Sequence, residues 1–168
     1  LADLAGPFLV LFFLSAGLSV PLWTEIAERI GTRATLLVSM PLAVGGFVFA
    51  ALLPAGNAVG FAAVCIASGA ALGADMVLLP AMFAIALSGA GLNAGTAFGI
   101  WSFAGKLGLA LAAFAVLPVL DLYGYQPGEP NPPRALSALN LSYAVLPCAL
   151  KLAAIGLVLT LPRKAATT

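Results

Sequence analysis

The longest apolar stretch of the chain runs from about residue 58 to residue 87 and contains a single charged side chain, Asp75. A helix needs roughly 20 apolar residues to cross the ~30 Å hydrocarbon core of a bilayer, so about 30 residues cross it with a tilt or with a kink at Pro80. An isolated charge at that depth costs on the order of 3 kcal/mol or more unless it faces protein or water. The stretch therefore predicts a membrane helix whose carboxylate has a partner.

The rest of the chain has the composition of such a helix. Of its 168 residues, 62% are hydrophobic and 8% are charged, whereas a soluble domain has about 25% charged residues. The other apolar stretches are separated by short polar or turn-forming segments. Together they predict an all-α polytopic membrane helix bundle, a single transmembrane domain with five spans at about residues 4–23, 34–53, 58–87, 94–120 and 136–161.

Two connections hold most of the charges outside the spans. The segment 24–32 is expected to be a short polar link with a helix stop at Gly31, and the segment 121–134 is expected to be an extramembrane loop because four prolines interrupt it. The positively charged residues divide unequally between alternate loops, with Arg134 on one side and four on the other: Arg29, Arg33, Arg163 and Lys164. The positive-inside rule then predicts a multi-pass protein of the cell membrane with its N-terminus outside and its C-terminus in the cytoplasm.

Several classes of function lack the residues that they need. The sequence has no histidine, no Cys-x-x-Cys, no paired carboxylates and no Gly-rich phosphate loop with its lysine, so metal-dependent hydrolysis, thiol redox chemistry and nucleotide hydrolysis are excluded. The few basic residues are scattered, which argues against a nucleic-acid surface. We therefore expect a protein that is not an enzyme and that has no cofactor.

Charge within the membrane is what remains for function. Asp75, Lys106 and Lys151 lie at comparable depth, and such residues either mark an ion or substrate pathway or form a structural pair. Lys106 shares a strip of small residues with Ser102, and we expect it to pair with Asp75. Lys151 is the weaker candidate, because it lies ~15 Å along the helix from the tail at 1.5 Å per residue, where snorkelling to the membrane surface is strained but can still explain it. Trp101 is near the lysine in depth and either stacks on a substrate or packs against helices or lipid.

A second group of charges lies in the expected link after the first span. It has two interpretations, a solvated loop or a conformational charge lock that breaks when two halves of a transporter rock. Its members are Glu25, Glu28, Arg29 and Arg33.

Four segments resemble a known family. The run from Pro21 to Arg33 resembles the cytoplasmic motif between helices eight and nine of major facilitator superfamily transporters. Gly99-Ile-Trp-Ser-Phe-Ala-Gly-Lys106-Leu-Gly-Leu-Ala-Leu-Ala112 is similar to helix eleven of the melibiose-permease-like glycoside-pentoside-hexuronide:cation symporters. The segments 120–128 and 144–151 extend that resemblance over nearly the whole chain.

The resemblance implies that the five spans are helices eight to twelve of a twelve-helix transporter. Lys106 then corresponds to the helix-eleven lysine close to the cation and sugar sites, and Asp75 falls on helix ten, which lines the central cavity. The family's main cation-binding carboxylates lie on N-terminal helices that this sequence does not contain. Those helices, the lipid bilayer, a sugar or similar small polar solute, and a coupling cation, sodium or proton, are the expected partners.

We therefore expect a secondary active transporter that carries a sugar or related small polar solute by cation-coupled symport and alternating access. The alternative is a non-transporting integral membrane protein, such as a lipid-modifying enzyme or an assembly subunit, in which the buried charges are structural. A lipid-modifying enzyme usually places its polar residues at the depth of the head groups, whereas Asp75, Lys106 and Lys151 lie near mid-depth, which favours transport.

Overall fold

A computed structural model describes residues 4–54, 56–91 and 93–161, and it contains five helical stretches that are long and apolar enough to cross a membrane. This confirms the all-α polytopic fold class. The helices are α1 (Ala5–Ile30), α2 (Thr32–Leu52), α3 (Ala58–Ala90), α4 (Ala94–Leu122) and a fifth stretch made of α5 (Pro133–Asn140), the π-helical η2 (Leu141–Val145) and α6 (Leu146–Thr160).

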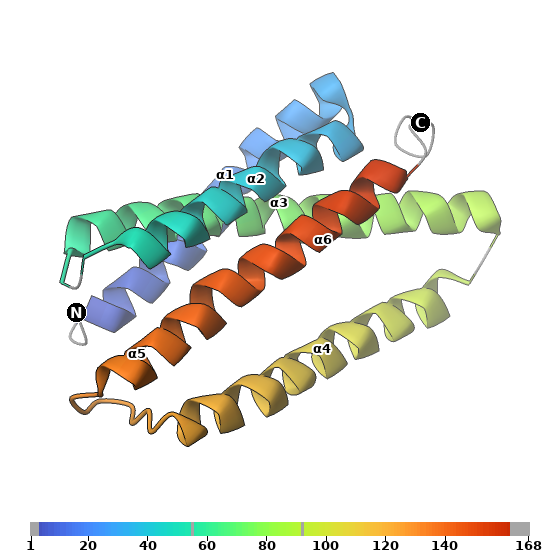
Figure 1. The fold of residues 1–168 in the computed structure, drawn as a ribbon. Coiled ribbons are helices and arrows are strands. Elements are labelled where there is room, and N and C mark those ends of the chain that lie inside the picture. The colour runs from blue at the N-terminus through green and yellow to red at the C-terminus, as the bar shows by residue number, and fades with distance from the viewer. Residues whose placement is uncertain (1–3, 55, 92, 162–168) are drawn as a thin grey trace.

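The five stretches run alternately in opposite directions (Figure 1). The start of α1, the α2–α3 turn and the Pro-rich loop between α4 and α5 lie on one side. The α1–α2 turn, the α3–α4 turn and the end of α6 lie on the other. This is the arrangement that short links between successive membrane spans produce. The basic residues Arg163 and Lys164, used to predict the orientation, lie outside the described residues.

The polar link expected at residues 24–32 is helical instead. Helix α1 continues past Trp23 to Ile30, and the chain turns at Gly31 alone, which has a φ of 86°. The sequence reading took charge as a sign of a loop. In the structure Glu25 and Arg29 form an i,i+4 ion pair, which supports a helix that extends beyond the apolar span.

The remaining turns use standard capping chemistry. The side chain of Asn57 accepts a hydrogen bond from the Gly60 amide at 2.8 Å, and that of Asn93 accepts one from the Thr96 amide at 3.1 Å. Gly91 ends α3 in the left-handed conformation, with a φ of 65°. These caps separate α2 from α3 and α3 from α4 with short connections.

Helices α1 and α3 approach closely at two glycines of the Gly69-xxx-Gly73 ridge. A Cβ on Gly69 would overlap the Phe12 carbonyl oxygen and lie 3.2 Å from the Ser15 Cβ, and one on Gly73 would overlap the Ala16 carbonyl oxygen. Glycines at this four-residue spacing are typical of closely packed membrane helices, and here they form a contact surface.

Polar side chains of α1 reinforce that contact. The Ser15 hydroxyl donates to the Ile66 carbonyl at 2.8 Å, and the Ser19 hydroxyl and the Trp23 indole both donate to the Ala70 carbonyl, at 3.2 and 2.7 Å. Trp23 ends the first predicted span, a position typical of an interfacial aromatic belt, but in the structure it is a core residue. Its ring is buried, because the last turns of α1 lie against α3 and contribute to the core.

The core lies where α1, α2, α3 and α6 meet. Its fully or nearly buried members are Trp23, Leu36, Met40, Ala74, Leu78 and Val158. Helix α4 does not contribute to it. In Figure 1, α4 runs apart from the other helices and is joined to them at its two ends. At its N-terminal end, Phe83 of α3 packs against Phe98 and Trp101 at centroid distances of 5.3 and 4.7 Å.

Prolines act differently in two of the spans. Helix α3 continues through Pro80 without a break. In the fifth span, the turn before Pro147 widens into the π-helical segment η2, in which the Leu146 amide bonds to the Leu141 carbonyl. A proline at position 147 has no N–H and crowds the carbonyl of residue 143 in a regular α-helix, so the wider turn relieves both problems.

Candidate functional site

The carboxylate of Asp75 forms an ion pair with Lys151, which joins the middle of α3 to α6. About a fifth of each side chain is exposed, 19% for the aspartate and 18% for the lysine. The expected pairing of Asp75 with Lys106 is wrong, and the lysine that the sequence reading ranked lowest is the partner. The reason is packing: α6 lies against α2 close to α3, whereas α4 lies apart.

The second oxygen of the same carboxylate has no partner among the described residues. Asp75 Oδ1 is buried and accepts no hydrogen bond there. Buried polar atoms are nearly always paired, so an orphan acceptor at membrane depth needs an explanation such as a bound ion or a polar ligand. Among the described residues, the site therefore has an unpaired acceptor, Asp75 Oδ1, on a carboxylate whose negative charge Lys151 partly neutralises.

A cavity of about 360 Å³ opens beside this ion pair. All four of the packed long helices contribute to its wall, and apolar and aromatic side chains make up most of it. The lining residues are Phe12, Ala43, Phe47, Ser68, Leu72, Asp75, Pro147, Leu150, Lys151 and Ala154. A mostly apolar cavity of about 300 Å³ or more with a few convergent polar groups is the usual form of a small-molecule site.

The residues predicted on α4 do not join this site. Trp101, Ser102 and Lys106 are all exposed, and none of them lines the cavity beside the ion pair. Trp101 packs against Phe83. Their part in an ion or substrate pathway stays a prediction.

The charges at the α1–α2 turn are divided between two roles. Glu25 and Arg29 pair within α1, and Glu28 is exposed. Arg33 instead donates to the Val158 and Leu159 carbonyls at 3.0 and 2.9 Å, which places its guanidinium on the C-terminal end of α6. The last carbonyls of a helix lack partners and carry partial negative charge, so the contact is favourable. The role of these four residues as a conformational charge lock stays a prediction.

Sequence reasoning missed the aromatic part of the cavity. Phe12 and Phe47 were read only as apolar residues of their spans, and nothing in the sequence distinguishes them from Phe13 or Phe49, which are exposed. The polar side of α1 did give a usable signal. Ser15, Ser19 and Trp23 recur every four residues and therefore share one face of the helix.

The family comparison decides how this site is to be interpreted. The family described as MFS/sugar transport protein matches residues 2–163, nearly the whole chain. The chain belongs to this family. No curated protein and no solved structure matches the chain significantly. The chain belongs to a major facilitator family of sugar transport proteins, and its described residues form five helices able to span a membrane, so it is a multi-pass membrane protein of the transporter class.

Proposed function

We propose that this chain works in a cation-coupled symporter of a sugar or related small polar solute, of the melibiose-permease-like type, and that Asp75 is a coupling carboxylate. The observation that carries the proposal is the Asp75–Lys151 ion pair inside the bundle, next to a cavity and with one carboxylate oxygen unpartnered. Ionisable residues within membrane spans mark ion and substrate pathways. Family membership supports transport in general.

The ion pair supplies a simple coupling step. A sodium ion or a proton and the Lys151 ammonium compete for the same carboxylate. When the cation binds Asp75, Lys151 loses its counter-charge, and the contact between α3 and α6 weakens. A conformational state in which the two helices separate then becomes more favourable, which is how differential binding shifts an equilibrium between states.

The proposal includes the rest of the transport path. Alternating access needs two repeats that rock around a central site, so the five helices would work together with N-terminal helices of the same protein. In the membrane, the Pro-rich loop would face outward and the α1–α2 turn would face the cytoplasm. Cysteines introduced at Glu129 and Glu28 test this orientation, since only the first should react with an impermeant maleimide added outside intact cells.

The main test is uptake by the natural chain that carries this sequence, reconstituted in vesicles. Labelled hexose, pentose and hexuronate are offered under an inward sodium gradient, an inward proton gradient or neither. We expect one of the gradients to stimulate uptake of at least one sugar. In Asp75→Asn that stimulation should disappear, while Asp121→Asn, at the exposed end of α4, serves as the matched control and should keep it. Because Lys106 corresponds by resemblance to the helix-eleven lysine close to the cation site, we expect Lys106→Ala to lose the cation dependence as well, while the protein still inserts into the membrane.

A second measurement separates coupling from structure. Removing one partner leaves an uncompensated charge, which costs about 3–5 kcal/mol for a buried pair, whereas replacing both partners is far less costly. Thermal unfolding of Asp75→Asn, Lys151→Met and the double variant in detergent should therefore show the double variant above both singles. If Asp75→Asn transports with unchanged ion dependence, the coupling role is wrong; if no gradient affects uptake of any sugar, symport itself is wrong.

A further inference from the structure

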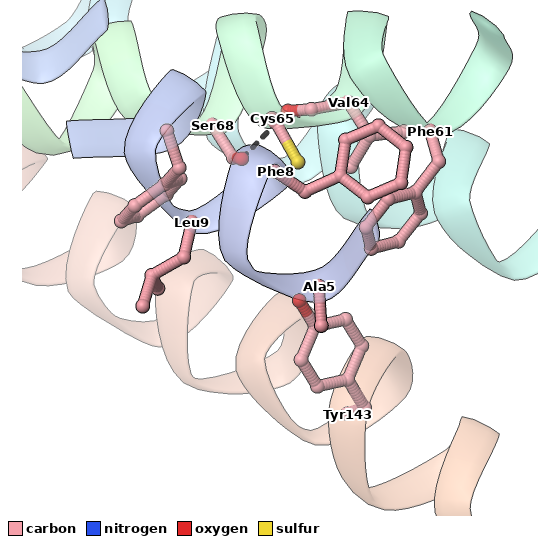
Figure 2. A pocket seen from close by; sticks show the side chains of 9 residues that line it. Ala5, Phe8, Leu9, Phe61, Val64, Cys65, Ser68 and Tyr143 are labelled. Atoms are coloured by element: carbon pink, nitrogen blue, oxygen red, sulfur yellow. Dashed lines mark hydrogen bonds between the residues drawn. The ribbon is translucent and has the colours of Figure 1, made fainter. Parts of the chain in front are cut away.

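A second cavity, of about 310 Å³, lies between α1, α3 and the π-helical segment η2. Figure 2 shows the rings of Phe8 and Phe61 together at one part of its wall and the side chain of Tyr143 rising from η2 at another. The rings of Phe8 and Phe61 meet edge to face, with centroids 5.0 Å apart. Three of the lining residues have polar side-chain atoms, namely Tyr143, Ser68 and Cys65, and the Ser68 hydroxyl donates to the Val64 carbonyl at 2.6 Å.

The widened turn at η2 helps to place Tyr143 in this wall. A π turn contains an extra residue, so side chains on it point in directions that a regular α-helix does not give. The turn exists because Pro147 follows, and Pro147 itself lines the cavity beside the ion pair. Tyr143 of η2 therefore lines one cavity, and Pro147, which follows η2 at the start of α6, lines the other.

The two cavities adjoin. Phe12 and Ser68 line both of them, and Phe47 of the ion-pair cavity packs edge to face on Tyr143, with centroids 6.3 Å apart. Asp75 and Lys151 supply the charge of this combined space within the ion-pair cavity, and most of its remaining wall is apolar or aromatic. Such a space matches a solute that has a polar part and an apolar ring.

We propose that the aromatic cavity is a subsite for an aromatic ring attached to the transported solute, and that Tyr143 is a specificity-determining residue of this subsite. The proposal rests on the proposed transport of a sugar, whose hydroxyls would lie toward Asp75 and Lys151. Rings of this kind prefer edge-to-face and offset contacts with other rings. The Phe8–Phe61 pair already has that geometry in the wall of this cavity, and Tyr143 has it with Phe47 of the adjoining ion-pair cavity.

A competition experiment tests the specificity. Uptake of the transported labelled sugar is inhibited with the phenyl and the methyl glycoside of that sugar. We expect the phenyl compound to inhibit about tenfold more strongly, the size of a good aromatic contact, and we expect Tyr143→Ala to remove the difference. Tyr143→Phe keeps the ring and should keep the preference. Tyr123→Ala, at the exposed end of α4, is the matched control and should also keep it.

A labelling experiment gives a readout that does not depend on transport. This sequence has two cysteines, so replacing Cys148 and every cysteine outside this sequence with serine leaves Cys65, which lines the aromatic cavity, as the single thiol. N-ethylmaleimide should modify Cys65 more slowly when the phenyl glycoside is present and at an unchanged rate with the methyl glycoside. Equal effects of the two glycosides in both experiments would overturn the subsite while leaving sugar uptake, and thus the proposed function, intact.

Two other outcomes are also decisive. If a lipid acyl chain fills the cavity, Cys65 will be protected in phospholipid vesicles without any glycoside and will react in short-chain detergent, where the lipid is removed. This result would overturn the proposal. If no sugar is taken up but the phenyl glycoside still protects Cys65, the aromatic site is supported and the proposed symport is wrong.

Discussion

Helices α3 and α4 both carry glycines at four-residue steps, but only α3 uses them for close packing. Gly69 and Gly73 lie against the backbone of α1, whereas a Cβ on Gly99, Gly105 or Gly108 would meet no atom within 4 Å among the described residues. The spacing alone therefore does not make a helix contact. What differs is the facing surface, since α1 offers small residues and hydrogen-bond donors to α3, and no helix of the described residues does the same for α4.

The largest effect that tests this comparison is expected from Gly73→Val. Its side chain would overlap the Ala16 carbonyl and the Ser19 hydroxyl, and overpacking of a close contact costs about 1–3 kcal/mol or more. We expect α1 to separate from α3, so that the protein elutes as aggregate on size exclusion in mild detergent. Gly99→Val, with open space around it, is the matched control and should elute like the wild type. An equal loss in both variants would show that α4 is packed as tightly as α3.

A smaller effect is expected from Trp23→Phe. The change removes the indole N–H that donates to the Ala70 carbonyl and leaves space in the core, and together these should lower the free energy of unfolding by about 1–3 kcal/mol. The measurement is thermal or denaturant unfolding in detergent. Trp101→Phe on α4, where the residue is 38% exposed, is the control and should change stability far less. An equal loss of unfolding free energy in Trp23→Phe and Trp101→Phe would contradict the difference in packing between the two helices.

The sequence was sufficient for much of the fold. Five helices follow from apolar stretches that match the thickness of a bilayer, and the Gly69-xxx-Gly73 ridge predicts a helix contact correctly. The partner of Asp75 could not be obtained in the same way. The predicted membrane depth of the lysines gave Lys106 and Lys151 as candidates. Only the arrangement of α4 and α6 relative to α3 distinguishes between them.

The charged residues of the candidate site could be predicted from the sequence, whereas the apolar residues that line its cavity could not. Asp75 stands out in any reading because a carboxylate in an apolar span is costly. An apolar side chain carries no such signal, so Phe12, Phe47 and Tyr143 emerge only once the helices are packed. The π turn at η2 has a local cause in Pro147, yet Pro80 and Pro118 lie inside helices that stay regular, so proline alone does not predict it.

The smallest effect in this comparison is expected from Ser19→Ala. The Ser19 hydroxyl shares its donor between the Ala16 carbonyl of its own helix, at 2.9 Å, and the Ala70 carbonyl of α3, at 3.2 Å. Because Trp23 also donates to the Ala70 carbonyl, that oxygen keeps a partner, and the loss should be limited to one modest hydrogen bond, about 0.5–1 kcal/mol. Unfolding midpoints in detergent measure it.

Ser102→Ala on the exposed face of α4 is the matched control for this change and should leave the unfolding midpoint where it is. The combination of Ser19→Ala with Trp23→Phe sharpens the comparison further. With both donors removed, the Ala70 carbonyl loses its side-chain partners on α1, so the double variant should lose more stability than the two single losses added together. Simple additivity would mean that the two hydrogen bonds act independently and that the polar face of α1 is not one cooperative contact.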